Sequence, residues 1–234
     1  MQFRKLWFLQ RLNIFQDFPQ ADLVTAARMM AEHTLKKHDR LYQSGDPADR
    51  VYFVKEGHLK IYRRGHFGQK ITLAILSPGE VFGELALSAG KIHEQEVEAL
   101  ETSLVCSMTA KDFQALLDLK PALAFRVIQN LGEQRRMLER KIANLVFKDV
   151  PARLAEALLE WAHGGGQPCA HALALDLVIT QQDLADLIGA TRQVVNATLK
   201  QFQRRGLIDS RRNCICLADP DGLRSVAEFP RLPN

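Results

Sequence analysis

The chain has 234 residues, of which 47% are hydrophobic and 25% are charged, and its formal net charge is +4. This composition is ordinary for a soluble globular protein and excludes a collagen-like, disordered or cysteine-stapled chain. The length allows one large domain or two of usual size. The basic excess is too small to identify a partner, although it is compatible with nucleic acid.

Neither a membrane-spanning nor a secretory segment is expected. No run approaches the roughly 18 consecutive apolar residues that cross a bilayer, and the apolar run at residues 6–9 is too short for a signal-peptide core. The cysteines, Cys106, Cys169, Cys214 and Cys216, form no CxxC pair, which favours thiols in a reducing compartment. We therefore expect a cytoplasmic protein with no membrane partner.

The N-terminal half changes from a helical to a strand-like pattern. Residues 19–32 predict a short helix that begins at Pro19, with Leu23, Ala26, Ala27 and Met30 on one face. From residue 35 to 107, β-branched and aromatic segments alternate with turns rich in Gly, Pro and Asp. Short strands between frequent turns predict one all-β unit, which is a sandwich, barrel or roll.

Two helices follow this unit. Thr109 is expected to cap a helix over 110–119, and Pro121 to open a longer one that runs to about Phe147. The apolar stripe of the longer helix consists of Val127, Leu131, Leu138, Ile142 and Leu145. A compact domain seldom hides a helix of roughly 40 Å on one narrow stripe, so we predict the seam of a parallel two-helix dimer. Packing of the stripe against its own domain is the alternative.

A second domain is expected to begin near residue 149. Pro151 disfavours helical geometry in the residue before it and ends the long helix. A further helix is expected over 152–162, followed by a flexible glycine-rich loop over 164–168. These boundaries divide the chain into a β-unit with flanking helices (1–120), a dimerisation helix (121–148) and a C-terminal domain (149–234).

Residues 180–200 carry the most specific motif in the chain. Thr180 is expected to cap a first helix that ends at Gly189, and Thr191 to cap a second helix after a tight turn. The residues expected in the core of the two helices are Leu184, Ala185, Ile188, Val194, Val195, Leu199 and Phe202. This is the helix-turn-helix arrangement, whose second helix lies in the DNA major groove.

The polar residues of this motif have the chemistry of base and phosphate recognition. Arginine pairs with guanine, and glutamine and asparagine pair with adenine. Two short strands around a basic turn predict a wing that meets phosphate. The predicted DNA contacts are Thr180, Gln181, Gln182, Thr191, Arg192, Gln193, Asn196, Lys200, Arg211 and Arg212. The alternative is an ordinary helical hairpin with a solvated basic face.

Nearly the whole chain resembles the cyclic-AMP receptor protein/FNR family of transcription regulators. Residues 79–87 are similar to the family's phosphate-binding cassette, 144–154 to its inter-domain hinge, and 179–208 to its recognition unit. The resemblance implies an α+β fold with an N-terminal cyclic-nucleotide-binding-like β-roll, a long dimerisation helix and a C-terminal winged helix-turn-helix. It also implies a homodimer that binds a palindromic operator in double-stranded DNA and activates transcription through RNA polymerase.

The effector pocket departs from the family pattern. Cyclic-nucleotide binders hold their ligand with the cassette's Gly and Glu, followed by an Arg next to Ser or Thr. Gly83, Glu84, Leu85 and Ala86 fit the first half of this pattern. His93 and Glu94 begin the segment that stands in place of the Arg-Ser/Thr pair, and Leu138 and Glu139 stand in place of a hydroxyl pair on the long helix. Carboxylates repel a phosphate, whereas Arg would provide a charge-assisted fork. We therefore expect no cyclic AMP in the usual pose, and either another small-molecule effector or none.

No cofactor, metal site or enzymatic activity is expected. No cysteine precedes Cys106, so the iron–sulfur ligands of the family's oxygen sensors are absent, and His58, His66 and His93 are only weak candidates for haem ligation. No metal-ligand cluster, nucleophile elbow or P-loop indicates an enzyme. The sequence thus predicts a sequence-specific DNA-binding regulator. The alternative is a ligand-binding regulatory module that acts through protein contacts.

Overall fold

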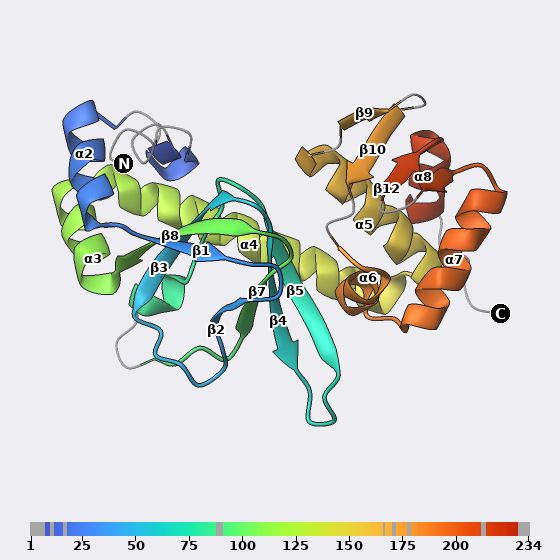
Figure 1. The fold of residues 1–234 in the computed structure, drawn as a ribbon, viewed down its shortest axis with the longest axis horizontal. Helices are drawn as coiled ribbons and strands as arrows, with labels where there is room; N and C mark the ends of the chain where they lie inside the picture. The colour runs from blue at the N-terminus through green and yellow to red at the C-terminus, as the bar shows by residue number, and fades with distance from the viewer. Residues whose placement is uncertain are drawn as a thin grey trace. The chain divides into compact units, whose positions relative to one another are not determined.

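The computed structural model of the chain describes residues 8–9, 12–15, 18–87, 91–165, 167–169, 172–176, 179–211 and 214–228 (Figure 1). The chain divides into two compact units. Unit 1 combines residues 1–64 and 73–136, and unit 2 combines residues 65–72 and 137–234.

Unit 1 contains two four-stranded sheets, as the alternating pattern predicts. The first has the order β1-β8-β3-β6, formed by Ala31–Leu35, Ser103–Thr109, Arg50–Glu56 and Val81–Phe82. The second has the order β2-β7-β4-β5, formed by Arg40–Tyr42, Glu96–Ala99, Leu59–Arg64 and Lys70–Leu76. The tip of the β4–β5 hairpin and the start of β5 belong to unit 2. The prediction of an all-β unit in this part of the chain is confirmed.

Alternation along the strands places apolar side chains on the facing sides of the two sheets. Leu59, Val97 and Ala99 of the second sheet pack with Val54 and Val105 of the first in one buried cluster. Successive side chains of a strand point to opposite faces. The residues between these apolar ones therefore form a charged outer face on the second sheet.

A second buried cluster covers the other side of the first sheet. Phe53 and Met108 pack there against α2 (Gln20–Met29) and α3 (Ala110–Leu119). The Thr109 hydroxyl accepts the N–H of Asp112 at 3.1 Å, which confirms the predicted cap of α3. The helix predicted over 19–32 is too long at its end, because residue 31 begins β1 and pairs with β8 instead.

The long helix α4 (Pro121–Phe147) has the predicted extent. Its residues up to 136 belong to unit 1 and the rest to unit 2. Leu123 is buried in the second cluster of unit 1. The predicted break follows, and α5 (Val150–Gly165) begins where the Asp149 carboxylate accepts the N–H of Ala152 at 2.9 Å.

Unit 2 is a helical domain with a small sheet. α5 packs against α6 (Gln181–Ile188), α7 (Arg192–Arg204) and α8 (Pro220–Glu228). The sheet has the order β11-β12-β10-β9, formed by Ile208–Arg211, Cys214–Leu217, Ala172–Asp176 and Gln167–Cys169. Buried side chains from the helices and the sheet, among them Leu158, Leu184, Phe202 and Ile215, form its core.

The prediction of a loop over residues 164–168 is wrong. α5 extends through Gly165, and β9 begins at Gln167. The physical reason is strand pairing, since β9 pairs with β10 and places Pro168 opposite Leu173, and β10 is itself paired with β12, which is distant in the sequence. Local sequence around the glycines carries no signal of that pairing.

Candidate nucleic-acid interface and effector pocket

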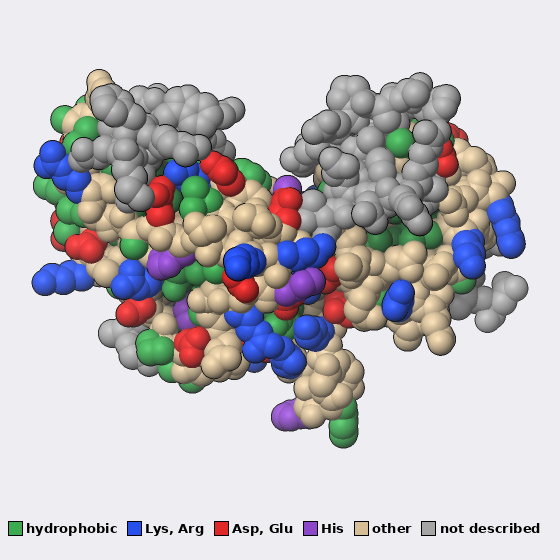
Figure 2. Space-filling view, viewed as in Figure 1, with side chains coloured by type: hydrophobic (Ala, Val, Ile, Leu, Met, Phe, Trp, Pro, Cys, Tyr) green, Lys and Arg blue, Asp and Glu red, His purple; other side chains and the backbone are tan. Residues whose placement is uncertain are grey.

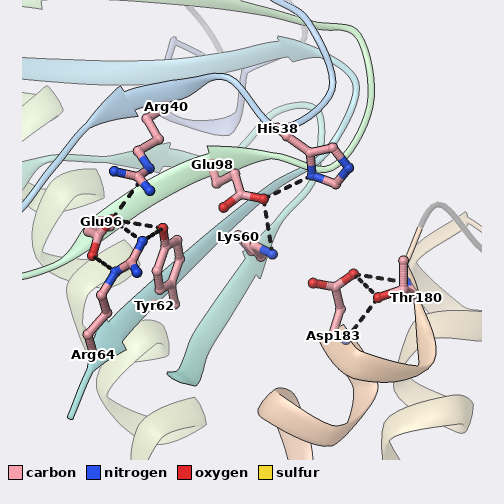
Figure 3. Close-up of polar contacts among 9 residues, drawn as sticks. All are labelled: His38, Arg40, Lys60, Tyr62, Arg64, Glu96, Glu98, Thr180 and Asp183. Carbon is pink, nitrogen blue, oxygen red and sulfur yellow. Dashed lines mark hydrogen bonds and ion pairs between the residues drawn. The ribbon is translucent and has the colours of Figure 1, made fainter. Parts of the chain in front are cut away.

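The turn between α6 and α7 is built as the sequence predicts. The Thr180 hydroxyl accepts the N–H of Asp183 at 3.1 Å, and the Asp183 carboxylate accepts the backbone N–H of Thr180 at 2.9 Å (Figure 3). Gly189 ends α6 with a φ of +64°, and a Cβ there would lie 2.9 Å from Leu145 Cδ2. Thr191 caps α7 through its hydroxyl alone, which accepts the N–H of Val194 at 3.3 Å. The two caps and the left-handed glycine fix the direction in which α7 leaves the turn.

α7 buries one side and exposes the other. Val195, Leu199 and Phe202 are buried, and Thr198 is buried with its hydroxyl donating to the Val194 carbonyl at 2.9 Å. Val194 is 42% exposed, so the prediction that it lies in the core is wrong. The buried stripe advances by three or four residues from Val195, which leaves Val194 at its edge.

The predicted base contacts lie on the open side of α7. Arg192, Gln193 and Lys200 are exposed, and Asn196 is half-buried. Figure 2 shows Lys and Arg side chains over the segment drawn as α7 in Figure 1. The first turn of α7 therefore presents donors and acceptors of the kind that pair with base edges. The DNA contacts themselves remain a prediction.

The residues at the start of α6 have structural partners of their own. Gln182 is exposed, and its amide donates to the Asp186 carboxylate at 2.7 Å, while Gln181 is half-buried. The Thr180 hydroxyl also donates to Asp183 at 2.6 Å. Thr180 and Thr191 thus act as helix caps, and any contact with phosphate is an additional role.

The predicted wing strands are present. β11 and β12 are antiparallel, with Arg211 opposite Cys214 at their open end. The side chain of Arg211 and the whole of Arg212 lie outside the described residues. Their contacts with phosphate therefore stay predictions.

The cassette in the roll of unit 1 keeps a backbone that requires glycine. Gly83 has a φ of +86°, and a Cβ there would lie 2.7 Å from the Arg50 carbonyl oxygen. Glu84 opens the short 3₁₀ helix η2 (Glu84–Leu87) and is half-buried, and Ala86 is buried in the second cluster. The side chain of Leu85 lies outside the described residues. A close approach to the backbone explains Gly83 without any ligand.

His93 is packed into the roll. It is 3% exposed, and its ring stacks on Tyr42 with centroids 3.6 Å apart and planes at 10°. Its buried Nε2 has no hydrogen-bond partner among the described residues. Burial lowers the pKa of His93 below its ordinary value, although the carboxylates of Asp46, Asp49 and Glu84 act in the opposite direction. The imidazole is therefore neutral at pH 7 and supplies no positive charge to a phosphate.

Further aromatic rings surround this stack. Tyr42 lies 5.6 Å from Tyr52, which in turn stacks on Phe82 at 5.2 Å between centroids. Burial, helped by Tyr52 and Glu84, raises the pKa of Tyr42 far above its ordinary value, so the phenol stays neutral. The neutral rings of this aromatic cluster supply no positive charge that could pair with a phosphate. Tyr42 is absent from the predicted pocket residues, because nothing in the local sequence links residue 42 to residue 93.

The outer face of the second sheet carries a charged network centred on Glu96 (Figure 3). Its carboxylate accepts hydrogen bonds from Arg64 Nε at 2.5 Å and from the Tyr62 hydroxyl at 2.8 Å, and Arg40 Nε lies 3.6 Å away. Burial acts to raise the pKa of Glu96, but these hydrogen bonds and the arginine charges outweigh it and hold the pKa below its ordinary value.

Two further carboxylates of this region are paired. Glu98 lies 3.2 Å from Lys60 Nζ and 3.1 Å from His38 Nδ1, and all three are drawn in Figure 3. Glu94 is exposed and pairs with Arg63 at 2.9 Å. The acidic residues after His93 are therefore neutralised by cations of the neighbouring strands.

The predicted seam of α4 divides into open and covered positions. Leu131, Leu138 and Ile142 are 37%, 48% and 55% exposed. Val127 packs against the core of unit 1, and Leu145 is half-buried. Leu138 and Glu139, which the resemblance places in the effector pocket, are both exposed on α4.

The described residues offer little to a metal or haem. No group of three or more His, Cys, Asp or Glu among them could hold a metal ion. His58 pairs with Glu101 at 2.6 Å, His66 is exposed, and His93 is stacked in the roll. None of the helices in the described part of the chain is long and apolar enough to cross a membrane.

Two family models match the two ends of the chain. Residues 32–120 match the cyclic nucleotide-binding domain, and residues 152–226 match the Crp-like helix-turn-helix domain. The global nitrogen regulator of Nostoc sp. is 30% identical over 210 residues, which cover 89% of this chain and 92% of that protein. The chain belongs to the CRP/FNR family of transcriptional regulators.

Other members of the CRP/FNR family are similar over the same length. The CRP-like cAMP-activated global transcriptional regulator of Mycobacterium tuberculosis is 27% identical over 92% of this chain and 96% of that protein. A CRP/FNR-family regulator of known structure from Thermus thermophilus is 28% identical, with a TM-score of 0.69 over 85% of this chain and 99% of that one. A CooA variant from Carboxydothermus hydrogenoformans, 24% identical, shares the fold with a TM-score of 0.73 over 91% of this chain and 92% of that one.

Family membership confirms the coarse predictions. The chain is a transcription regulator with a DNA-binding helix-turn-helix and a sensor domain of the cyclic-nucleotide-binding type. Its relatives regulate transcription and are not enzymes, in agreement with the sequence. The predicted α+β fold, with a roll, a long helix and a C-terminal winged helix-turn-helix, is also confirmed.

Proposed function

We propose that the chain is a homodimeric, cytoplasmic regulator that reads a palindromic operator in double-stranded DNA and activates transcription through contact with RNA polymerase. One observation carries the proposal: the first turn of α7 exposes Arg192 and Gln193 while the following residues anchor the helix in a core. In this proposal residues 1–120 sense, 121–148 dimerise and 149–234 bind DNA.

The proposed dimer is formed by α4. The helix exposes a stripe of aliphatic side chains that includes Leu138 and Ile142. A palindromic operator requires two copies of α7 about 34 Å apart, one turn of DNA, and a two-fold symmetric dimer supplies two such copies. Arg211 and Arg212 of each wing would meet phosphates beside the half-site.

The proposed regulation does not use cyclic AMP in the usual pose. The neutral His93 stacked on Tyr42, together with Glu94 in the place of the family's Arg, supports this part of the proposal. The effector is then another small molecule, or the chain binds DNA without one. Any effector must act by binding one arrangement of the two domains more tightly than another.

Binding-site selection with Arg192→Ala tests the DNA-binding role. We expect relaxed preference at one base pair in each half-site and a loss of roughly 1–3 kcal/mol per contact. Arg205→Ala is the matched control, because Arg205 lies at the opposite end of the same helix. Its effect, if any, should be equal for all sequences. Uniform weakening by Arg192→Ala would remove that residue from base recognition.

A thermal-shift titration of the full chain tests the effector. Cyclic AMP at micromolar concentration is expected to leave the unfolding midpoint unchanged, whereas a ligand at 100 times its Kd stabilises by about 2.7 kcal/mol. A rise with cyclic AMP would overturn this part of the proposal and leave the DNA-binding role intact.

A further inference from the structure

α4 has the positions of a two-stranded coiled coil. Ile128, Arg135 and Ile142 recur every seven residues, and Leu131, Leu138 and Leu145 follow each of them by three. In heptad notation the first set occupies position a and the second position d. Ile at a with Leu at d favours two parallel strands. The apolar stripe predicted from the sequence contains the d set and Ile142 but lacks Ile128, which is 63% exposed.

The flank of this stripe is already in contact with the chain's own strands. Val127 packs into the core of unit 1, and the Gln134 amide donates to the Val81 carbonyl at 3.1 Å. Lys141 donates to the Thr72 carbonyl. These three residues precede the three a positions by one residue each. These contacts hold that flank of α4 against the chain's own strands, while, of the a and d positions, Ile128, Arg135, Leu138 and Ile142 stay exposed.

Arg135 is the single charged residue on the stripe, at its central a position, and it is exposed. In a parallel pair aligned in register, each a residue meets the same residue of the partner. The two Arg135 side chains then share one level, with Glu139 one turn further along each helix. A shift by one heptad would set each Arg135 against Ile128 or Ile142, which makes two polar defects in the apolar seam instead of one.

We propose that Arg135 determines the register and the strand number of the α4 pairing, so that the partner is a second copy of this chain aligned in register. The inference rests on the proposed homodimer. A single polar a residue specifies alignment at a cost in stability. Removal of the Arg135 charge should therefore strengthen the pairing of the two α4 helices and make their alignment less specific.

Sedimentation equilibrium of the full chain tests the energetic half of this inference. Arg135→Ile is expected to lower the dissociation constant by about tenfold or more, because an aliphatic seam avoids the desolvation of two guanidinium groups. Arg136→Ile is the matched control, since Arg136 is exposed on the same turn but lies off the stripe. It should leave the constant unchanged. An equal constant for wild type and Arg135→Ile would overturn the inference.

Cross-linking with a short bis-maleimide tests the alignment. Ile128→Cys and Ile142→Cys chains are each expected to link to themselves and not to one another when mixed, after subtraction of the links formed by the chain's own cysteines. In the Arg135→Ile background, links between residues 128 and 142 or species larger than a dimer should appear. A dimer with only like-to-like links in that background would overturn the role of Arg135. A wild-type chain that stays monomeric would instead overturn the proposed homodimer.

Discussion

The recognition unit and the effector pocket differ in how much of their motifs they retain. The turn from Thr180 to Asn196 has both caps, the left-handed glycine and an open polar face together. In the roll, the cassette retains Gly83 and Glu84, but the following segment offers a neutral, stacked His93. The recognition unit thus has every polar feature of its motif, whereas the cassette is followed by a neutral ring and by Glu94.

This difference shows which residues a fold requires and which a ligand requires. Gly83 is held in place by the roll's own backbone, so it would persist with or without a nucleotide. The position of His93 carries no such backbone constraint, and its neutral ring adds no positive charge near the carboxylates of Asp46, Asp49 and Glu84. Similarity in the cassette is therefore weaker evidence for a nucleotide than similarity in the recognition helix is for DNA.

The largest effect is expected for Gly83→Ala. The positive φ alone costs about 1–3 kcal/mol, and the contact with the Arg50 carbonyl and Tyr52 ring adds overpacking of similar size. We expect a loss of about 3 kcal/mol or more in the free energy of unfolding, measured by urea denaturation. Gly68→Ala is the control, because its φ is +82° but nothing lies within 4 Å. Equal losses for the two variants would remove the steric role of Gly83.

The next largest effect is expected for Glu96→Gln. The variant leaves Arg64, Tyr62 and Arg40 without their buried carboxylate, which should cost about 1–3 kcal/mol. Because the folded pKa of Glu96 is lowered, its contribution is present above the ordinary carboxyl pKa and is lost as pH falls through the folded pKa. The free energy of unfolding of the variant should therefore depend less on pH in the acid range.

Glu94→Gln provides the matched control for that experiment. Its ion pair with Arg63 is solvent-exposed on both sides, and such pairs contribute about 0–1 kcal/mol. The comparison separates the contribution of the buried Glu96 network from that of the exposed Glu94–Arg63 pair. If Glu94→Gln lowered the free energy of unfolding as much as Glu96→Gln does, burial would make no contribution to the stability of the Glu96 network.

The recognition unit could be predicted from sequence because its signals are local. Thr180, Gly189 and Thr191 are spaced within one helical hairpin, and each acts on its own neighbours. The extent of α4 follows in the same way from Pro121 at its start and Pro151 beyond its end. Helix caps, helix-breaking residues and the helical period of apolar residues can each be recognised within a short stretch of sequence.

The pocket and the charged face could not be predicted in this way. The stack joins residue 42 to residue 93, and the Glu96 network draws on residues 40, 62 and 64. β10 joins the sheet of the wing strands by pairing with β12. Such contacts depend on which strands become neighbours, and a strand's own sequence specifies which of its faces is apolar but not its partner.

A smaller effect is expected for Thr180→Ala in the recognition unit. Loss of the cap leaves the Asp183 N–H without its acceptor and should cost about 1 kcal/mol. Thr180→Ser keeps the hydroxyl and should restore the free energy of unfolding measured by urea denaturation. DNA affinity of the two variants then distinguishes the roles of this residue. A loss of affinity in Thr180→Ser at full stability would mean that the threonine methyl group contacts DNA directly.

The smallest effect is expected for His93→Phe, and it concerns pH more than stability at pH 7. The unfolded chain takes up a proton near the ordinary histidine pKa of about 6.5, whereas buried His93 does so only at lower pH. Wild-type stability should therefore fall as pH drops below about 6.5, and His93→Phe, which keeps a ring on Tyr42, should flatten that decline in a urea titration at several pH values. His66→Phe, at an exposed histidine, should leave the slope as it is. Identical slopes in all three chains would mean that His93 is protonated alike in the folded and unfolded states, and the contrast between the polar recognition helix and the neutral ring of His93 would fail.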